Sequence, residues 1–342
     1  MMLCRCVVVI AVLASALTFP LTPPVDAQSR RQKRELTAPE APPKAPSSVQ
    51  DLSSGKPHEP PASADDGDVI SVTSNLVPLL ASVVNAQGEA VPHLTLADFE
   101  LLVDGSPRPI GELSRSEMPV RLALLFDNSS SLNVAREFEK RAAVRFFRRV
   151  IRPIDQASII SISSTPEMVQ TLTSDVKRLV DVIEGFGKPK GATAMLDAVA
   201  QAAEYLLPQQ GRKVIIIVSD GADTVSERSF EATMRLVQAA NCQVYAVQTG
   251  QSANANLHDL TAERRLRDLT SQTGGAMFVP QTTSDLDATF TQISADLAQQ
   301  YVLSYYPMEE KRDGRFHAVA LRVPTQPATR VRTRKGYYAP KG

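Results

Sequence analysis

The pentapeptide 127–131, Asp-Asn-Ser-Ser-Ser, directly follows the apolar run 120–126 and places one carboxylate and several hydroxyls on one loop. A second apolar run, 214–218, also ends at an acidic turn, and a threonine lies in the segment 191–198 between the two runs. Because parallel strands carry their binding loops at their carboxyl ends, the three segments can converge on one point. Two carboxylates and three hydroxyls around an open position suit Mg²⁺, which prefers octahedral oxygen and keeps some waters. The sequence therefore predicts a metal site formed by Asp127, Ser129, Ser131, Thr193 and Asp220.

This order of residues, Asp-x-Ser-x-Ser followed by a threonine and then by an aspartate after an apolar strand, resembles the metal-ion-dependent adhesion site of the von Willebrand factor type A family. Every position of the pattern is filled in this sequence. The resemblance implies bound Mg²⁺ (or Mn²⁺) and a protein ligand that offers an Asp or Glu carboxylate. It covers roughly residues 120–298. The flanking segments 94–109, 301–306 and 332–340 resemble those of the exported acidobacterial "VWFA-related" subfamily.

Between these flanks, short apolar runs alternate with segments of helical periodicity, as the positioning of such a site requires. We expect strands at 120–126, 157–162, 214–218, 244–247 and 277–279, and helices near 134–151, 176–183, 196–207, 230–240, 260–269 and 286–297. Ser174 is the expected N-cap of the second helix. This alternation predicts an α/β fold with a doubly wound, mostly parallel sheet and helices on both faces.

The first helix shows an apolar stripe and many basic residues. The expected buried stripe is Val134, Phe138, Ala142, Phe146 and Val150. The basic side chains are read as a solvated face, with an anion-binding face as the alternative; they are Arg136, Lys140, Arg141, Arg145, Arg148 and Arg149. Glu137 and Arg141 have the spacing of a favourable helical ion pair.

Segments 69–118 and 300–342 contain short apolar runs separated by turns rich in Asn, Asp and Gly, which indicates antiparallel strands. Strands are expected at 76–84, 96–103, 301–306, 316–323 and 331–338. Each segment is too short to bury a core alone. We therefore predict that they pair into one small antiparallel β-sandwich, into which the domain 119–299 is inserted. The connections at Met118-Pro119 and near Ala298 would then form a double hinge.

The N-terminus has a basic start, an apolar stretch and small residues before Gln28, the pattern of a secretory signal at 1–27. Residues 28–68 are rich in Pro, Ser and Ala and predict a disordered linker. We expect an exported protein, periplasmic or extracellular, with no stable membrane span after signal removal. Cys4 and Cys6 would leave with the signal, so Cys242 is expected to be a buried, inert thiol.

Composition narrows the function. The 37 basic and 37 acidic residues balance, which does not favour a nucleic-acid partner. The four histidines lack zinc spacing, and neither a phosphate loop nor a nucleophile elbow occurs. We therefore expect the protein not to be an enzyme. We expect it to be an exported, metal-dependent protein-binding module of the adhesion type. Two alternatives stay open, a metal-assisted phosphohydrolase that uses Asp127 and a structural envelope component with a vestigial site.

Overall fold

The computed structural model describes residues 77–115, 118–128, 136–187, 191–249, 257–306 and 313–339. All of them fall within one compact unit, Val69–Gly342. The predicted signal peptide and linker lie outside the described residues, as do the predicted metal ligands Ser129 and Ser131.

A six-stranded sheet forms the centre of the α/β domain, with the strand order β10-β9-β8-β5-β6-β7. Its strands are β5 (Val120–Asp127), β6 (Gln156–Ile162), β7 (Glu167–Thr173), β8 (Arg212–Ser219), β9 (Cys242–Gln248) and β10 (Met277–Phe278). All neighbours run parallel except β6 and β7, which are antiparallel. The predicted fold class is therefore confirmed. The edge strand β7 was not predicted, because its side chains are mostly half-buried and polar and give no continuous apolar run.

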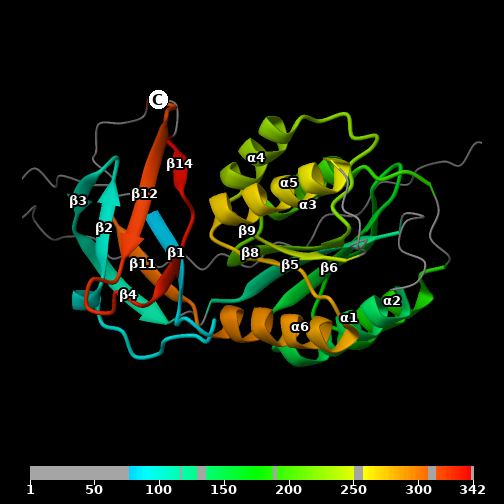
Figure 1. Cartoon of the computed structure of the whole chain (residues 1–342), viewed down its shortest axis with the longest axis horizontal. Coiled ribbons are helices and arrows are strands. Elements are labelled where there is room, and N and C mark those ends of the chain that lie inside the picture. The colour runs from blue at the N-terminus through cyan, green and yellow to red at the C-terminus, as the bar shows by residue number, and fades with distance from the viewer. Residues whose placement is uncertain are drawn as a thin grey trace, which may run out of the picture. The chain divides into compact units, whose positions relative to one another are not determined.

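Helices cover both faces of this sheet (Figure 1). They are α1 (Arg136–Val150), α2 (Val176–Gly185), α3 (Met195–Leu206), α4 (Phe230–Ala239), α5 (Leu257–Thr273) and α6 (Thr283–Ala298). Side chains alternate between the two faces along a strand. Leu122, Leu124 and Phe126 of β5 accordingly pack against α1, α2 and α6, whereas Ala123 and Leu125 pack against α3, α4 and α5. The central strand is thus buried on both sides, which explains the continuous apolar run 122–126 within it.

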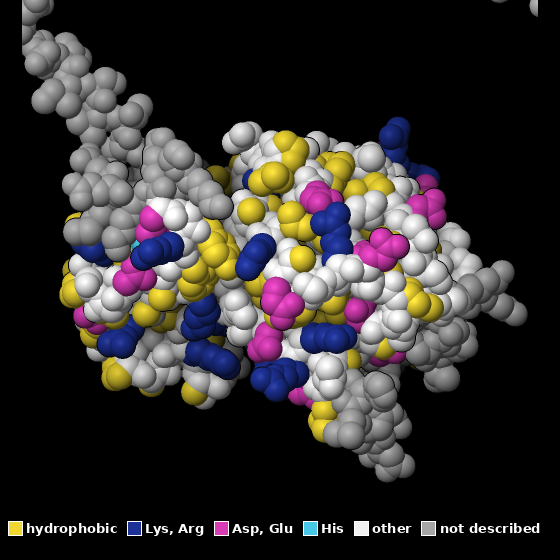
Figure 2. All heavy atoms as spheres, turned by 90° about the horizontal axis from the view of Figure 1, so that it is seen from above, with side chains coloured by type: hydrophobic (Ala, Val, Ile, Leu, Met, Phe, Trp, Pro, Cys, Tyr) yellow, Lys and Arg dark blue, Asp and Glu magenta, His cyan; other side chains and the backbone are white. Residues whose placement is uncertain are grey.

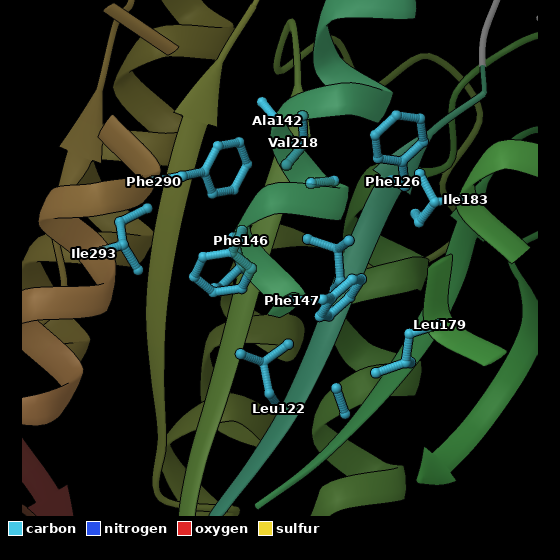
Figure 3. Close-up of a cluster of buried hydrophobic side chains, with 14 of the residues drawn as sticks. Leu122, Phe126, Ala142, Phe146, Phe147, Leu179, Ile183, Val218, Phe290 and Ile293 are labelled. Atoms are coloured by element: carbon cyan, nitrogen blue, oxygen red, sulfur yellow. The ribbon is translucent and has the colours of Figure 1, made fainter. Parts of the chain in front are cut away.

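Several phenylalanine side chains pack together in the core on the α1 side of the sheet (Figure 3). Phe146 packs against Phe290 of α6 with ring centroids 5.2 Å apart, and it also contacts Phe147 at 5.9 Å. Phe126, at the carboxyl end of β5, stacks on Phe186 at 5.4 Å. These contacts fix α1 and the loop after α2 against the strand that carries the predicted metal ligand Asp127.

Two four-stranded antiparallel sheets, with the orders β13-β1-β11-β4 and β14-β12-β2-β3, share a second core. Their strands are β1 (Val77–Val84), β2 (Glu100–Val103), β3 (Ser106–Arg108), β4 (Ile110–Arg115), β11 (Tyr301–Tyr305), β12 (Phe316–Arg322), β13 (Arg330–Arg332) and β14 (Gly336–Tyr338). The strand β11 pairs with both β1 and β4, and β12 pairs with β2. Strands before and after the α/β domain therefore form one antiparallel sandwich, as the fold class predicted. The exact domain boundaries stay a prediction.

Four local expectations need correction. Residues 96–98 form a 3₁₀ turn, η1 (Leu96–Asp98), so β2 begins later than predicted. Segment 331–338 is split between β13 and β14. The cap of α2 is Asp175, whose side chain accepts a hydrogen bond from Arg178 N, and not Ser174. Glu137 forms its ion pair with Lys140, at 3.5 Å, rather than with Arg141.

The buried face of α1 also differs from the predicted stripe. Phe138 is 42% exposed, whereas Glu139 is fully buried. Arg136 and Lys140 are buried as well, so these two residues do not belong to a solvated face. The helix therefore turns charged side chains toward the protein interior near its first turn, while Ala142 and Phe146 are buried as expected. Val134 lies outside the described residues.

A buried polar network joins the α/β domain to the sandwich. The buried side chain of Gln300 donates from Nε2 to Gln243 Oε1 at 2.7 Å and to Ser82 Oγ of β1 at 3.1 Å. Arg212 Nη1 donates to Gln300 Oε1 at 3.0 Å and to the carbonyl oxygen of Leu297 at 2.8 Å. Hydrogen bonds of this kind are costly to leave unmade. They favour a fixed orientation at this connection over the double hinge that the sequence predicts.

A buried carboxylate adds a second link at the same junction. Asp296 of α6 pairs with Arg332 of β13 at 2.9 Å and accepts a hydrogen bond from the hydroxyl of Tyr245. Burial, followed by the charge of Asp296, raises the pKa of Tyr245 well above its ordinary value, so the hydroxyl stays protonated and donates. The end of α6 is thus held from both the sheet and the sandwich.

The predicted buried thiol is confirmed. Cys242 is a free, buried cysteine at the start of β9. Burial raises the pKa of this thiol to about 12. Since the thiolate is the reactive form, Cys242 is inert at neutral pH.

Basic and acidic side chains are interspersed on the face shown in Figure 2, rather than gathered by sign. This agrees with the balanced formal charge of the sequence. Among the described residues, none of the helices has the length and apolar character needed to cross a membrane.

Asp155 should stabilise the domain where the chain enters β5. It is buried and accepts hydrogen bonds from Val120 N at 2.8 Å and from Arg152 Nε at 2.7 Å. Burial opposes its ionisation, but the hydrogen bonds and the charge of Arg152 hold the pKa of Asp155 below its ordinary value. We expect Asp155→Asn to lower the free energy of unfolding at pH 7 by about 2–4 kcal/mol.

This contribution depends on pH in a defined direction. Because the folded-state pKa of Asp155 is depressed, the stability is complete above the unfolded pKa and is lost as pH falls through the folded one. Denaturant unfolding of both proteins at several pH values should show the difference shrinking below about pH 4. A difference that grows on acidification would contradict the assignment.

Leu303 lies at the centre of the sandwich, in the strand that pairs with both β1 and β4. Its side chain is almost completely buried, whereas that of the adjacent Val302 is only half-buried. We expect Leu303→Ala to lower the free energy of unfolding by about 2–5 kcal/mol, through lost burial and a residual cavity. Val302→Ala, measured by the same denaturant titration, should cost clearly less. Equal effects would show that β11 does not anchor this core.

Candidate metal centre

Asp127 and Ser219 are the last residues of the adjacent parallel strands β5 and β8. The register pairs Phe126 with Val218, so the next residues, Asp127 and Ser219, face each other at the carboxyl edge of the sheet. Ser219 Oγ donates a hydrogen bond to Asp127 Oδ2 at 2.6 Å, and it accepts one from Gly221 N at 3.0 Å. Asp127 is only 1% exposed. Its carboxylate is therefore held in one orientation by the neighbouring strand.

Asp220 follows directly at the turn after β8 and is half-buried. Its Oδ1 accepts a hydrogen bond from Ala222 N at 2.9 Å, which shapes the turn. Gln248, at the end of β9, donates from Nε2 to the carbonyl oxygen of Asp220 at 3.1 Å. The structure thus places Asp127 and Asp220 at the ends of neighbouring strands, as the sequence predicted.

Thr193 is buried in the loop before α3 and is tied to the loop after β8. Its N–H donates to Thr224 Oγ1 at 3.0 Å, and Thr224 N donates to the Thr193 carbonyl oxygen at 2.8 Å. Asp197 strengthens this link, because its carboxylate accepts hydrogen bonds from Glu227 N at 2.9 Å and Arg228 N at 3.0 Å. The loops that carry Thr193 and Asp220 are therefore joined to each other.

Arg136, at the start of α1, is a part of this edge that the sequence analysis missed. Its Nη1 donates to the carbonyl oxygen of Asp127 at 2.8 Å, and its Nη2 donates to Asn128 Oδ1. The guanidinium lies over the rings of Phe126 and Phe186, at 5.3 Å and 5.7 Å from the centroids. This cation fixes the backbone that leads from β5 into the predicted metal-binding loop.

Glu139 is the second unexpected residue. It is fully buried, and neither of its carboxylate oxygens has a hydrogen-bond partner among the described residues. Burial raises the pKa of Glu139 to about 7; Thr249 and Arg136 oppose the rise, while the charges of Asp127 and Asp220 add to it. The Thr249 hydroxyl lies near enough to the Glu139 carboxylate to lower this pKa as a weak donor, but the pair falls outside regular hydrogen-bond geometry. The carboxylate therefore lies within electrostatic reach of both predicted metal ligands.

The groups at this edge fit a hard divalent cation. Among the described residues, no three His, Cys, Asp or Glu side chains gather closely enough to bind a metal alone. The predicted ligand set does not require this, since it combines two carboxylates with hydroxyl oxygens. Buried polar atoms without a hydrogen-bond partner in the described part of the chain also occur at Gln248 and Thr249, where β9 ends, and at Glu139 of α1.

The solved structures that this chain matches share little sequence with it. One is an aerotolerance-related membrane protein from Bacteroides fragilis, with 16% identity, a TM-score of 0.42, and coverage of 52% of this chain and 98% of that one. Another is BatB from Bacteroides thetaiotaomicron, with 18% identity, a TM-score of 0.40, and coverage of 51% and 97%. A third is the vWF domain of the pilus tip protein Mfa5 from Porphyromonas gingivalis, with 13% identity, a TM-score of 0.44, and coverage of 52% and 94%.

A search of curated proteins gave no match to this chain. Residues 122–222 match a family model described as von Willebrand factor type A domain. The matched segment runs from β5 to the turn after β8, so it includes Asp127, Thr193 and Asp220 together with the strands that hold them. The resemblance of the flanks to the acidobacterial subfamily stays a prediction. Over residues 122–222, the chain is thus similar to the von Willebrand factor type A domain family.

Proposed function

We propose that this protein is an exported binding module that holds another protein through a divalent cation, and that it is not an enzyme. The observation that carries the proposal is the arrangement of Asp127 and Asp220 at the ends of neighbouring strands, with Asp127 oriented by Ser219. A ligand must be held in one geometry before the metal arrives, and this hydrogen bond supplies that restraint.

The cation would be Mg²⁺ or Mn²⁺, held by Asp127, Ser129, Ser131, Thr193 and Asp220. When bound, it supplies a Lewis-acidic position that an Asp or Glu carboxylate of a partner protein can fill. Ser219 orients Asp127 through a hydrogen bond to its carboxylate, and Arg136 holds the Asp127 backbone through its carbonyl oxygen. The predicted signal peptide supports a periplasmic or extracellular site of action.

The burial of Asp127 favours binding over phosphoryl transfer. An attacking carboxylate needs an oxygen that a substrate phosphorus atom can approach. Asp127 is almost completely buried, and one of its oxygens already accepts the Ser219 hydrogen bond. Such a group suits a metal ligand better than a nucleophile.

Asp127→Ala should abolish Mg²⁺ binding and leave a folded protein, because it removes a direct ligand while the strand core stays intact. Removal of a residue that only supports a metal ligand typically weakens binding about 10–100-fold. We expect the loss of Mg²⁺ affinity in Asp127→Ala to be larger than that. Titration calorimetry gives the affinity, and circular dichroism reports the fold. Asp181→Ala, which removes an exposed carboxylate paired with Lys177 on α2, is the control and should bind normally. Unchanged Mg²⁺ affinity in Asp127→Ala would disprove the site.

The absence of catalysis can be checked separately. We expect no Mg²⁺-dependent hydrolysis of simple phosphate esters above the buffer rate, because a buried Asp127 cannot attack phosphorus. Release of inorganic phosphate over several hours measures this. Robust hydrolysis that disappears in Asp127→Asn would favour the phosphohydrolase. Metal binding with no partner that depends on it would favour a structural envelope component.

A further inference from the structure

We propose that Glu139 is a third carboxylate of the metal centre and acts by holding a metal-bound water rather than the metal itself. The inference rests on the proposed metal site and adds a residue outside the Asp-x-Ser-x-Ser pattern. It starts from one observation, that a fully buried carboxylate of α1 lacks a hydrogen-bond partner among the described residues.

A buried carboxylate without a partner is expensive, because burial removes its water and nothing replaces it. The surroundings of Glu139 increase this cost, since the charges of Asp127 and Asp220 both disfavour its ionised form. The neighbouring cation, Arg136, is already engaged by the Asp127 carbonyl oxygen and by Asn128. A further positive charge at the strand ends would offset the repulsion between these three carboxylates.

The charges at this edge have the right sum for a divalent cation. Asp127, Asp220 and Glu139 bring three negative charges when ionised, and Arg136 brings one positive charge. Two negative charges remain, and one Mg²⁺ neutralises them. The charge of Glu139 therefore stabilises the metal-bound site and destabilises the metal-free one.

An indirect role follows from the spacing of the acidic side chains. No three acidic, His or Cys side chains of the described residues come close enough to share a metal directly. Mg²⁺ usually keeps several of its waters, and those waters need acceptors. A buried carboxylate whose two oxygens are unused can accept their hydrogen bonds. Groups in this outer position typically change metal affinity by about 10–100-fold.

A purely structural role is the competing explanation. Glu139 is in the first turn of α1, where a negative charge interacts favourably with the helix dipole. If that were its function, removing the charge would destabilise the metal-free protein. If Glu139 supports metal binding, removing its charge stabilises the fold of the metal-free protein and lowers its affinity for the metal. The two roles therefore predict opposite changes in the metal-free state.

The experiment compares wild type, Glu139→Gln and Glu137→Gln after treatment with a chelator. Calorimetric titration with Mg²⁺ gives the affinity, and thermal unfolding without metal gives the melting temperature. Glu137 is the matched control, because it lies two residues away on the same helix with a side chain 74% exposed. We expect Glu139→Gln to bind Mg²⁺ about 10–100-fold more weakly and to melt at the same or a higher temperature. Glu137→Gln should match wild type in both.

Each outcome decides the inference. Wild type that binds no Mg²⁺ would overturn both this inference and the proposed function. Wild type and Glu139→Gln with equal affinity would overturn the role of Glu139 and leave the metal site standing. A lower melting temperature of metal-free Glu139→Gln would assign the residue to the fold. Equal weakening by Glu137→Gln would show that any nearby charge has the same effect.

Discussion

The structure of the candidate site depends on the shared ending of two parallel strands. β5 and β8 are paired in register up to Phe126 and Val218, so the side chains that follow meet at the edge of the sheet. The hydrogen bond from Ser219 to Asp127 exists only in this register, because a slip of one residue would turn one side chain to the opposite face. The buried cores on both faces of the sheet prevent such a slip.

The sequence predicted the central sheet and the place of Asp127 and Asp220, because buried parallel strands read as continuous apolar runs and ligands follow their ends. It did not predict β7, whose half-buried face leaves no such run. Apolar periodicity also misplaced the buried face of α1, because it ignores charged residues. Glu139 is spaced three and seven residues before the buried Ala142 and Phe146, so the helical position alone could have identified it. Nothing in the sequence could show that its carboxylate lacks a partner.

The junction with the sandwich and the candidate metal site lie at opposite ends of β8. Arg212 begins β8 and binds Gln300 at the junction, while Ser219 ends β8 and binds Asp127. This continuity does not by itself couple the two sites, since coupling needs an element with two alternative arrangements. The dense hydrogen bonding around Gln300 argues for a single arrangement. The sandwich is better understood as a fixed support for the α/β domain than as a hinge.

A third carboxylate would alter what the metal offers to a partner. With Asp127, Asp220 and Arg136 alone, a bound divalent cation leaves one net positive charge, which would attract any acidic surface. With an ionised Glu139 the loaded site is neutral, so net charge contributes little to the approach of a partner. Recognition would then rest on the open coordination position and on the loops around it, including 222–228. Loops of this kind commonly carry the specificity of a rigid scaffold. An ionised Glu139 would thus weaken the general attraction of the site to acidic surfaces. In return, the site would bind the metal more tightly and would select its partner protein by geometry.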